Sequence, residues 1–95
     1  MRLEAYQIDF LKQLVCDINP TSKLFLFGSR AHDTQKGGDI DILLLTKKRL
    51  PLAQKWDIKN RFCKKFGQQQ LDIINFTFEQ KSNFKDLILQ DAIKL

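Results

Sequence analysis

The chain has 95 residues, of which 43% are hydrophobic and eight are Phe, and it carries 16 basic and 11 acidic residues for a net charge of +5. This length fits one small domain over residues 1–95 and excludes a polymerase of several domains, while the hydrophobic content excludes a disordered chain. No apolar run approaches the roughly 20 residues of a membrane span, and the charged start lacks a signal-peptide core, so we expect a cytoplasmic protein without membrane contact. The positive charge favours polyanionic partners, although a solvated basic surface explains it equally well.

The first half of the chain predicts a helix followed by two strands. Apolar residues at steps of three and four indicate a helix over Leu3–Ile18, which Asn19-Pro20 ends because proline disfavours helix in the residue before it. The apolar run Lys23–Phe27 predicts a strand, and a second strand is expected over Asp39–Leu45. Between the two strands, a short helical turn could form within Arg30–Gln35.

A second helix is expected over Leu52–Phe66, with Gly67 as its C-terminal stop. Its apolar side would face the sheet and its basic side would lie outside, the two sets being Trp56, Phe62, Cys63 and Phe66, and Lys55, Lys59 and Arg61.

A third strand over Gln70–Phe76 and a last helix from Ser82, which is a good N-cap, complete the order. The apolar stripe of that helix consists of Phe84, Leu87, Ile88 and Leu95. The order helix, strand, strand, helix, strand, helix predicts an α+β (α/β) fold in which a small mixed β-sheet is backed by helices on one side.

Three carboxylates interrupt strongly apolar strands: Asp39, Asp41 and Asp72. Positions i and i+2 of a strand project from the same face, so Asp39 and Asp41 would lie side by side, and a divalent cation between them would relieve their repulsion. A third carboxylate on a neighbouring strand would complete a two-metal Mg²⁺ site suited to in-line phosphoryl or nucleotidyl transfer. The alternative is that these strands have one solvent face, where alternating Asp is ordinary.

Gly28-Ser29 adds an anion-binding turn to these carboxylates. It follows an apolar strand and precedes a possible helical turn, whose N-terminus offers free N–H groups and partial positive charge. Glycine allows close approach to a phosphate, the Ser29 hydroxyl adds a donor, and Arg30 could add charge. A Gly-Ser pair alone is usually just a turn, but here it stands beside the Asp-x-Asp pair.

At this point the sequence resembles a known family. The segments Leu24–Ala31 and Gly38–Leu44 are similar to the signature of minimal nucleotidyltransferases of the DNA-polymerase-β superfamily, and the likeness extends over Leu24–Ile74. The loop before Asp39 is one residue shorter than in many relatives, and Gly38 stands where they have Ser. The resemblance implies a polymerase-β-like nucleotidyltransferase fold.

The resemblance also implies residue roles. Gly28 and Ser29 would bind the nucleotide triphosphate, with Arg30 beside it. Asp39 and Asp41 would bind the metals, and Asp72 would complete the site and help activate the attacking hydroxyl.

The same resemblance implies a Mg²⁺-dependent enzyme that moves an NMP group, AMP from ATP or another NTP, to a hydroxyl acceptor. Many relatives of this size are encoded beside an all-helical HEPN protein and act as the antitoxin of the pair, and some transfer AMP to that partner. A HEPN-type partner and a nucleotide are therefore expected. Separately, some of Phe76, Phe78 and Phe84, together with the last helix, could form the interface of a homo- or hetero-oligomer.

Two other readings remain open. The first is an antitoxin that neutralises its partner by direct contact, with a weak or idle site. The second is a small nucleic-acid-binding domain, which is not favoured because Lys47–Arg49 and Lys64-Lys65 are the only basic clusters. His32 is expected to be exposed, and the two cysteines, Cys16 and Cys63, to be buried or half-buried thiols.

Overall fold

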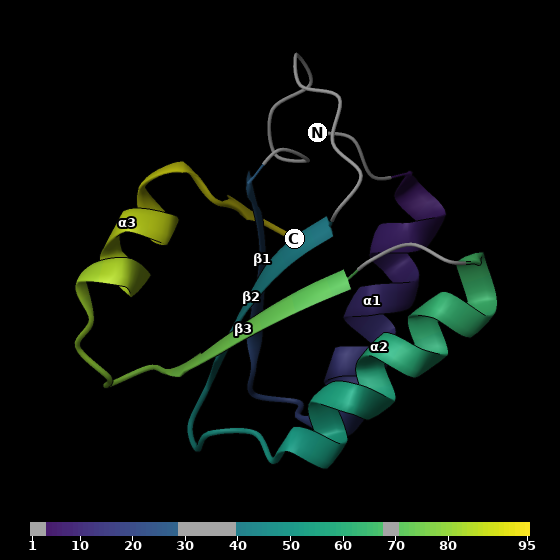
Figure 1. Ribbon diagram of the computed structural model, residues 1–95, viewed down its shortest axis with the longest axis horizontal. Coiled ribbons are helices and arrows are strands. Elements are labelled where there is room, and N and C mark those ends of the chain that lie inside the picture. The colour runs from purple at the N-terminus through teal and green to yellow at the C-terminus, as the bar shows by residue number, and fades with distance from the viewer. Residues whose placement is uncertain (1–3, 29–39, 68–70) are drawn as a thin grey trace.

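The computed structural model describes residues 4–28, 40–67 and 71–95, and in this part of the chain three helices surround a four-stranded sheet (Figure 1). The elements in chain order are α1 (Ala5–Ile18), β1 (Lys23–Phe27), β2 (Ile40–Thr46), α2 (Leu52–Phe66), β3 (Leu71–Thr77), α3 (Asn83–Asp91) and β4 (Ile93–Lys94). The expected α+β fold with a small mixed sheet is confirmed. The predicted order is also confirmed, and β4 is an additional short strand that was not expected from the sequence.

The helix ends follow local signals. Glu4 and Gln7 form a capping box at the start of α1, in which the Glu4 N–H donates to Gln7 Oε1 at 3.1 Å. Ser82 caps α3 by accepting a hydrogen bond from the Lys85 N–H at 3.3 Å, as predicted. Gly67 ends α2 with a φ of 87°, also as predicted. None of the described helices is long and apolar enough to cross a membrane.

The sheet has the strand order β3-β2-β1-β4. β1 runs antiparallel to both β2 and β4, whereas β2 and β3 are parallel and are joined through α2. The register pairs Phe27 with Asp41 across β1 and β2, and it pairs Asp41 with Asp72 across β2 and β3. Two predicted site residues are thus neighbours in the sheet.

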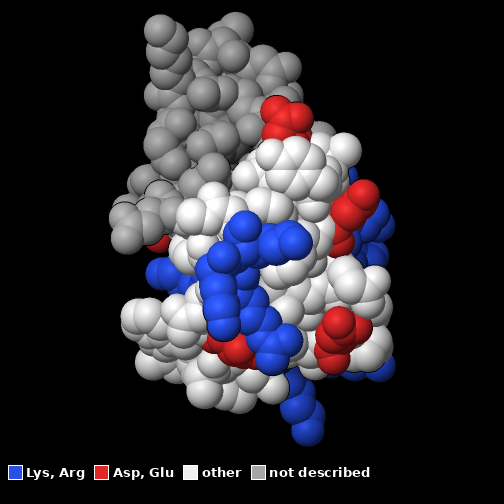
Figure 2. Space-filling model, turned by 90° about the vertical axis from the view of Figure 1, so that its right-hand side faces the viewer, with Lys and Arg blue, Asp and Glu red and all other residues white. Residues whose placement is uncertain are grey.

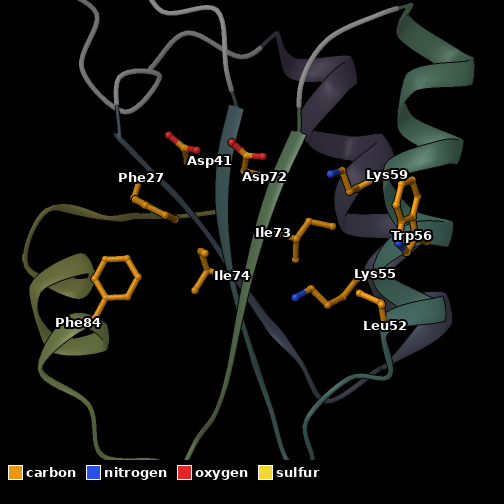
Figure 3. A pocket seen from close by; sticks show the side chains of 10 residues that line it. All are labelled: Phe27, Asp41, Leu52, Lys55, Trp56, Lys59, Asp72, Ile73, Ile74 and Phe84. Atoms are coloured by element: carbon orange, nitrogen blue, oxygen red, sulfur yellow. The ribbon is translucent and has the colours of Figure 1, made fainter.

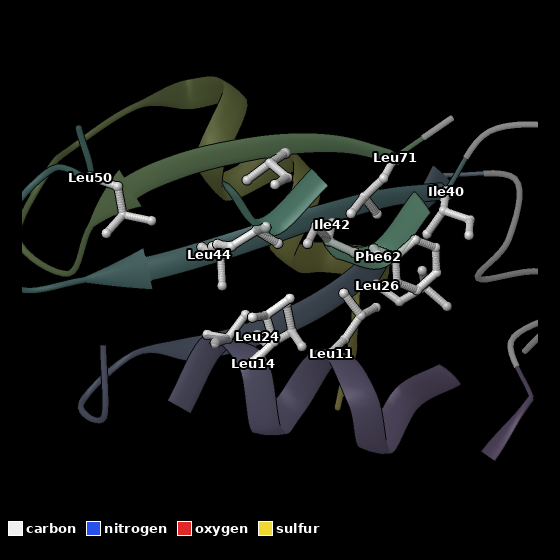
Figure 4. Close-up of a cluster of buried hydrophobic side chains, with 13 residues drawn as sticks. Leu11, Leu14, Leu24, Leu26, Ile40, Ile42, Leu44, Leu50, Phe62 and Leu71 are labelled. Atoms are coloured by element: carbon white, nitrogen blue, oxygen red, sulfur yellow. The ribbon is translucent and has the colours of Figure 1, made fainter. Parts of the chain in front are cut away.

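One face of the sheet carries the main hydrophobic core. α1 and α2 pack on this face (Figure 1), and Figure 4 shows side chains of both helices and of β1, β2 and β3 meeting there. Leu11, Leu26, Ile42 and Phe62 are fully buried in this cluster.

The opposite face is covered by α3, which corrects the expectation that all helices lie on one side (Figure 1). β2 is the physical reason. Its Leu43 and Leu45 are buried just as Ile42 and Leu44 are, so this central strand is apolar on both faces. A strand of that kind needs a cover on each side.

Two helices, α2 and α3, bury other side chains than predicted, so each is rotated about its own axis relative to the prediction. Ile58 and Phe62, four residues apart, form the buried stripe of α2, so Trp56 falls outside it and is 54% exposed. In α3 the buried residues are Lys85 and Ile88, and Phe84 and Leu87 are exposed.

Two further residues, Leu95 and Cys16, differ from expectation. Leu95 lies beyond the last helix, and its N–H donates to the Leu24 carbonyl, while Cys16 is exposed and only Cys63 is half-buried.

Lys85 is buried because its ammonium group replaces water with backbone carbonyls. Its Nζ donates to the carbonyl oxygens of Thr77, Phe78 and Gln80 at 3.1, 2.9 and 3.0 Å. All three of its N–H donors are therefore satisfied, which makes burial of the charge tolerable. This lysine fixes the segment between β3 and α3, and with it the position of α3 over the sheet.

Candidate active site

Asp41 and Asp72 are held side by side by the register of the two parallel strands. They are Cα partners in the β2–β3 ladder, and neighbouring strands in a sheet lie about 4.8 Å apart. Both side chains are half-buried, and both project to the face that α3 covers, because the alternate positions of each strand pack into the main core. Figure 3 shows the two carboxylates together near the end of the sheet at which β2 and β3 begin.

Gly28 directly adjoins this pair. It follows Phe27, the register partner of Asp41, and its φ of 77° lies in the left-handed region that favours glycine. A Cβ at this position would meet the carboxylate of Asp41. Glycine is therefore required here both by the backbone conformation and by the space. Gly28, the described residue of the predicted phosphate-binding turn, lies against a predicted metal ligand.

The other predicted site residues lie outside the described part of the chain: Ser29, Arg30 and Asp39, together with the short turn expected within residues 30–35 and His32. Within residues 4–28, 40–67 and 71–95 no third His, Cys, Asp or Glu joins Asp41 and Asp72 in a metal-binding group. The roles of Ser29, Arg30 and Asp39 stay predictions.

A pocket of about 560 Å³ opens beside the two carboxylates (Figure 3). It extends past them along β3, between α2 and α3. Its lining consists of Phe27, Asp41, Leu52, Lys55, Trp56, Lys59, Asp72, Ile73, Ile74 and Phe84.

The lysines of this pocket were not expected at a site. Lys55, Lys59 and Arg61 were expected on the outer side of α2, and only Arg61 fits that expectation, being exposed and paired with Asp57 at 3.0 Å. Lys55 and Lys59 are half-buried and line the pocket. Their spacing of four residues, flanking the Ile58–Phe62 stripe, is the signal that could have placed them there.

The electrostatic character of the pocket therefore changes along its length. At one end two carboxylates concentrate negative charge on neighbouring strands, and along α2 two ammonium groups line the wall. Lys59 Nζ also lies 5.5 Å from the centre of the Trp56 ring, a cation–π distance. Carboxylate oxygens in this arrangement are donors that Mg²⁺ prefers, so Asp41 and Asp72 fit a divalent metal.

Comparison with known proteins agrees with the fold. A tri-AMPylated Shewanella oneidensis HEPN toxin in complex with an MNT antitoxin matches with a TM-score of 0.66 at 17% identity, over 97% of this chain and 71% of that chain. A variant of the toxin–antitoxin MntA-HpeT matches with a TM-score of 0.73 at 21% identity, over 93% and 70% of the two chains. A toxin–antitoxin structure with AMP-PNP gives 0.68 at 21% identity, over 97% and 72%.

At these identities the structural likeness shows the fold. A comparison with curated proteins finds no match. The family model of polymerase beta nucleotidyltransferases, however, matches residues 11–95, which is most of the chain. Together with the paired Asp41 and Asp72, this match shows that the chain belongs to the polymerase beta nucleotidyltransferase family.

Proposed function

We propose that residues 1–95 act as one minimal nucleotidyltransferase domain that moves AMP from ATP, with Mg²⁺, to a hydroxyl group of a HEPN-type helical partner. In this role the protein would be the antitoxin of a toxin–antitoxin pair. The observation that carries the proposal is the register of β2 and β3, which pairs Asp41 with Asp72 beside the Gly28 turn.

The proposed roles follow from position. Asp41 and Asp72, with Asp39, would hold the metal, and the Gly28 turn with Ser29 and Arg30 would bind the triphosphate. Bound Mg²⁺ would neutralise charge that develops on the phosphate oxygens during transfer. Asp72 lies on the edge strand β3, and with Ile73 and Ile74 it lines the pocket, so it would orient the acceptor hydroxyl and receive its proton.

The reaction is a displacement at the α-phosphorus. The acceptor oxygen forms a bond to this phosphorus while the bond to the oxygen that bridges toward the β-phosphate breaks. Pyrophosphate leaves, and the acceptor carries one AMP group. Positioning and charge stabilisation supply most of the rate in such transfers.

The partner is proposed from the structural neighbours. One of them is an MNT antitoxin in complex with a tri-AMPylated HEPN toxin, and another is a toxin–antitoxin structure with AMP-PNP. These descriptions apply to those proteins. For this chain they support a HEPN-type acceptor and an adenine nucleotide as the first choices to test.

The direct test is an incubation of the purified protein with ATP, Mg²⁺ and the product of the neighbouring gene as the candidate partner, followed by intact-mass measurement of both chains. We expect the partner to gain the mass of one or more AMP groups. Asp41→Asn should abolish this gain, whereas Asp9→Asn, which makes the same chemical change at an exposed position of α1, should leave it intact.

Absence of transfer with ATP, GTP, CTP and UTP, together with a stable complex that Asp41→Asn leaves unchanged, would contradict the proposal. That result would instead assign the protein to antitoxins that act by contact.

A further inference from the structure

The two edges of the sheet differ. At one edge the two-residue strand β4 covers β1, pairing Leu26 with Ile93, and the Leu95 N–H adds a bond to the Leu24 carbonyl at 2.9 Å. At the other edge lies β3, a strand of seven residues. Figure 1 shows β3 running between α2 and α3 with β2 behind it.

Within the described residues, β3 shows none of the features that usually protect an edge strand. Proteins commonly block such edges with Lys, with Pro or with a covering element. β3 contains neither Lys nor Pro. Among the described residues, the backbone groups of Leu71 to Asn75 form hydrogen bonds only within the ladder with β2. Every second residue of an edge strand directs its N–H and C=O away from the sheet, so this edge offers a row of donors and acceptors.

The pocket extends around this edge, and it is called the groove below. Ile73 and Ile74 are neighbours in sequence and point to opposite faces of the sheet, yet both line the pocket (Figure 3). Leu52 and Trp56 of α2 line it on one side and Phe84 of α3 on the other.

These three helix residues are also unusually exposed. Leu52, Trp56 and Phe84 are among the five large hydrophobic residues that are exposed in the described part of the chain, at 67%, 54% and 51%. Exposed apolar residues gathered around one groove mark a binding surface.

Charge selects the kind of partner. Lys55 and Lys59 extend from α2 toward β3 in Figure 3, and the surface formed by α1 and α2 gathers Lys and Arg side chains in Figure 2. α2 carries Lys55, Lys59, Arg61, Lys64 and Lys65 against one acidic residue, Asp57. A second copy of this chain would bring the same lysines against themselves, whereas an acidic segment would neutralise them.

We propose that the open edge of β3 binds an extended acidic segment of the partner protein, which adds to the sheet as a fifth strand. The chemistry at Asp72 rests on the proposed function. The added strand would hold the acceptor side chain directly opposite Asp72, on the face that α3 covers.

The register gives this segment a pattern. Residues directly opposite one another in two strands lie on the same face, and successive residues alternate between faces. The residue opposite Asp72 therefore faces the carboxylates, and the residues before and after it face α2. Acidic residues at these two positions would meet Lys55 and Lys59, so the recognised segment has a hydroxyl residue with an acidic residue on each side.

The test uses the full chain without ATP or metal, so it is independent of transfer. The probe is a short peptide in which Glu alternates with Val around a central Tyr. Trp56, the one Trp of the chain, lines the groove, so its fluorescence reports binding. Amide hydrogen exchange shows where on the protein the peptide binds. We expect the peptide to change Trp56 fluorescence and to slow exchange in β3.

Two matched variants test the charges. Lys55→Glu with Lys59→Glu should weaken peptide binding about tenfold or more, because two attractive contacts become repulsive. Lys64→Glu with Lys65→Glu makes the same change in net charge on the same helix, at exposed positions outside the groove, and should weaken binding about twofold or less. Equal weakening by both pairs would overturn the role of the groove.

A backbone-methylated peptide tests the strand pairing. N-methyl groups on alternate residues remove edge N–H donors but keep every side chain, so binding should be lost in one of the two methylated registers. Unchanged binding in both registers, or no Trp56 response at millimolar peptide, would overturn the proposal.

Two other occupants would also overturn it. Tighter binding of an oligouridylate, lost in the Lys55→Glu and Lys59→Glu variant, would assign the groove to nucleic acid. A dimer in sedimentation with β3 protected from exchange in the absence of peptide would assign the edge to a second copy. If the peptide binds as expected but no AMP transfer occurs with the helical partner, the edge assignment stands and the proposed enzymatic function fails.

Discussion

The two faces of the sheet have different contents. Among the described residues, thirteen buried hydrophobic side chains close the face under α1 and α2, whereas the face under α3 has three, surrounded by partly buried aromatic and aliphatic side chains. Asp41 and Asp72 both lie on the second face. The difference indicates that stability is concentrated on one side of the sheet, so the other side can accommodate charge.

This division suits a small domain. A chain of this size has a free energy of unfolding of roughly 5–10 kcal/mol, which leaves little margin for buried charges in its main core. Placing the carboxylates on the less densely packed face, near the start of β2 and β3, limits the desolvation cost of their charges. Substitutions on the two faces should therefore separate loss of stability from loss of function.

The largest effect is expected from Phe62→Ala. Phe62 is fully buried, and its ring lies 4.9 Å from that of Phe66 and 6.4 Å from that of Phe10. Removing it should lower the free energy of unfolding by about 3–5 kcal/mol, measured by urea denaturation. Phe84→Ala makes the same change on the α3 face, where the side chain is half-exposed, and should cost about 1 kcal/mol or less. Equal losses would contradict the division between the faces.

A smaller loss is expected from Lys85→Met. Its ammonium group bonds three carbonyl oxygens between β3 and α3, and methionine keeps the apolar stem but offers no donor. We expect about 2 kcal/mol lower stability and faster amide exchange in α3. Lys81→Met changes an exposed lysine of the same segment and should have little effect. If both variants were equally stable, Lys85 would not be what holds α3 on the sheet.

The sequence predicted the elements well and the buried polar groups poorly. β1 and α2 have the expected bounds, since turn residues and hydrophobic periodicity mark both. The sequence did not predict the structural role of buried Lys85 and Asn75, because most of their hydrogen-bond partners are backbone atoms. Asn75, for example, accepts from the Leu50 N–H at 2.7 Å across 25 residues of sequence.

The candidate site was predicted only in part, for a similar reason. Alternation within a strand indicates which face Asp41 occupies, and a motif indicates Gly28 and Asp72. That Lys55 and Lys59 share a pocket with them depends on how α2 rotates against the sheet. Burial of Ile58 rather than Trp56 sets this rotation, and a helix with several apolar residues around its circumference leaves that choice open.

Gly28→Ala should have a moderate effect that reports on the site itself. At a φ of 77° an alanine costs about 1–2 kcal/mol, and its methyl group would in addition displace the Asp41 carboxylate. Gly67→Ala is a control for strain at a positive φ, because Gly67 has a φ of 87° and, among the described residues, no atom lies near the added methyl group. Gly67 has a ψ of −169°, in a region that is essentially restricted to glycine, so its own strain differs from that of Gly28 and a double variant is needed to isolate the close approach to Asp41.

The double variant Gly28→Ala with Asp41→Ala sharpens this comparison. Removing the carboxylate should recover the part of the loss that comes from the contact of the added methyl group with Asp41, and a double-mutant cycle measures this coupling. Additive losses would mean that the turn and the carboxylate do not touch.

The smallest effect on stability, and the largest on activity, is expected from Asp72→Asn. In the absence of metal, Asp41 and Asp72 repel each other across the β2–β3 ladder, so removing one charge should leave the free energy of unfolding unchanged or raise it by about 0.5 kcal/mol. With Mg²⁺ the wild-type protein should become more stable than the variant.

The wild-type Tm should rise with metal concentration, because a ligand that binds only the folded state stabilises it, and the Tm of Asp72→Asn should not rise. AMP transfer to the partner should fall about 100-fold or more in the same variant. Asp9→Asn, which makes the same change at an exposed position of α1, should keep both the metal-dependent rise in Tm and the transfer. If the Tm of Asp72→Asn also rose with Mg²⁺, the metal would bind elsewhere. The two carboxylates on the α3 face would then need an explanation other than metal binding.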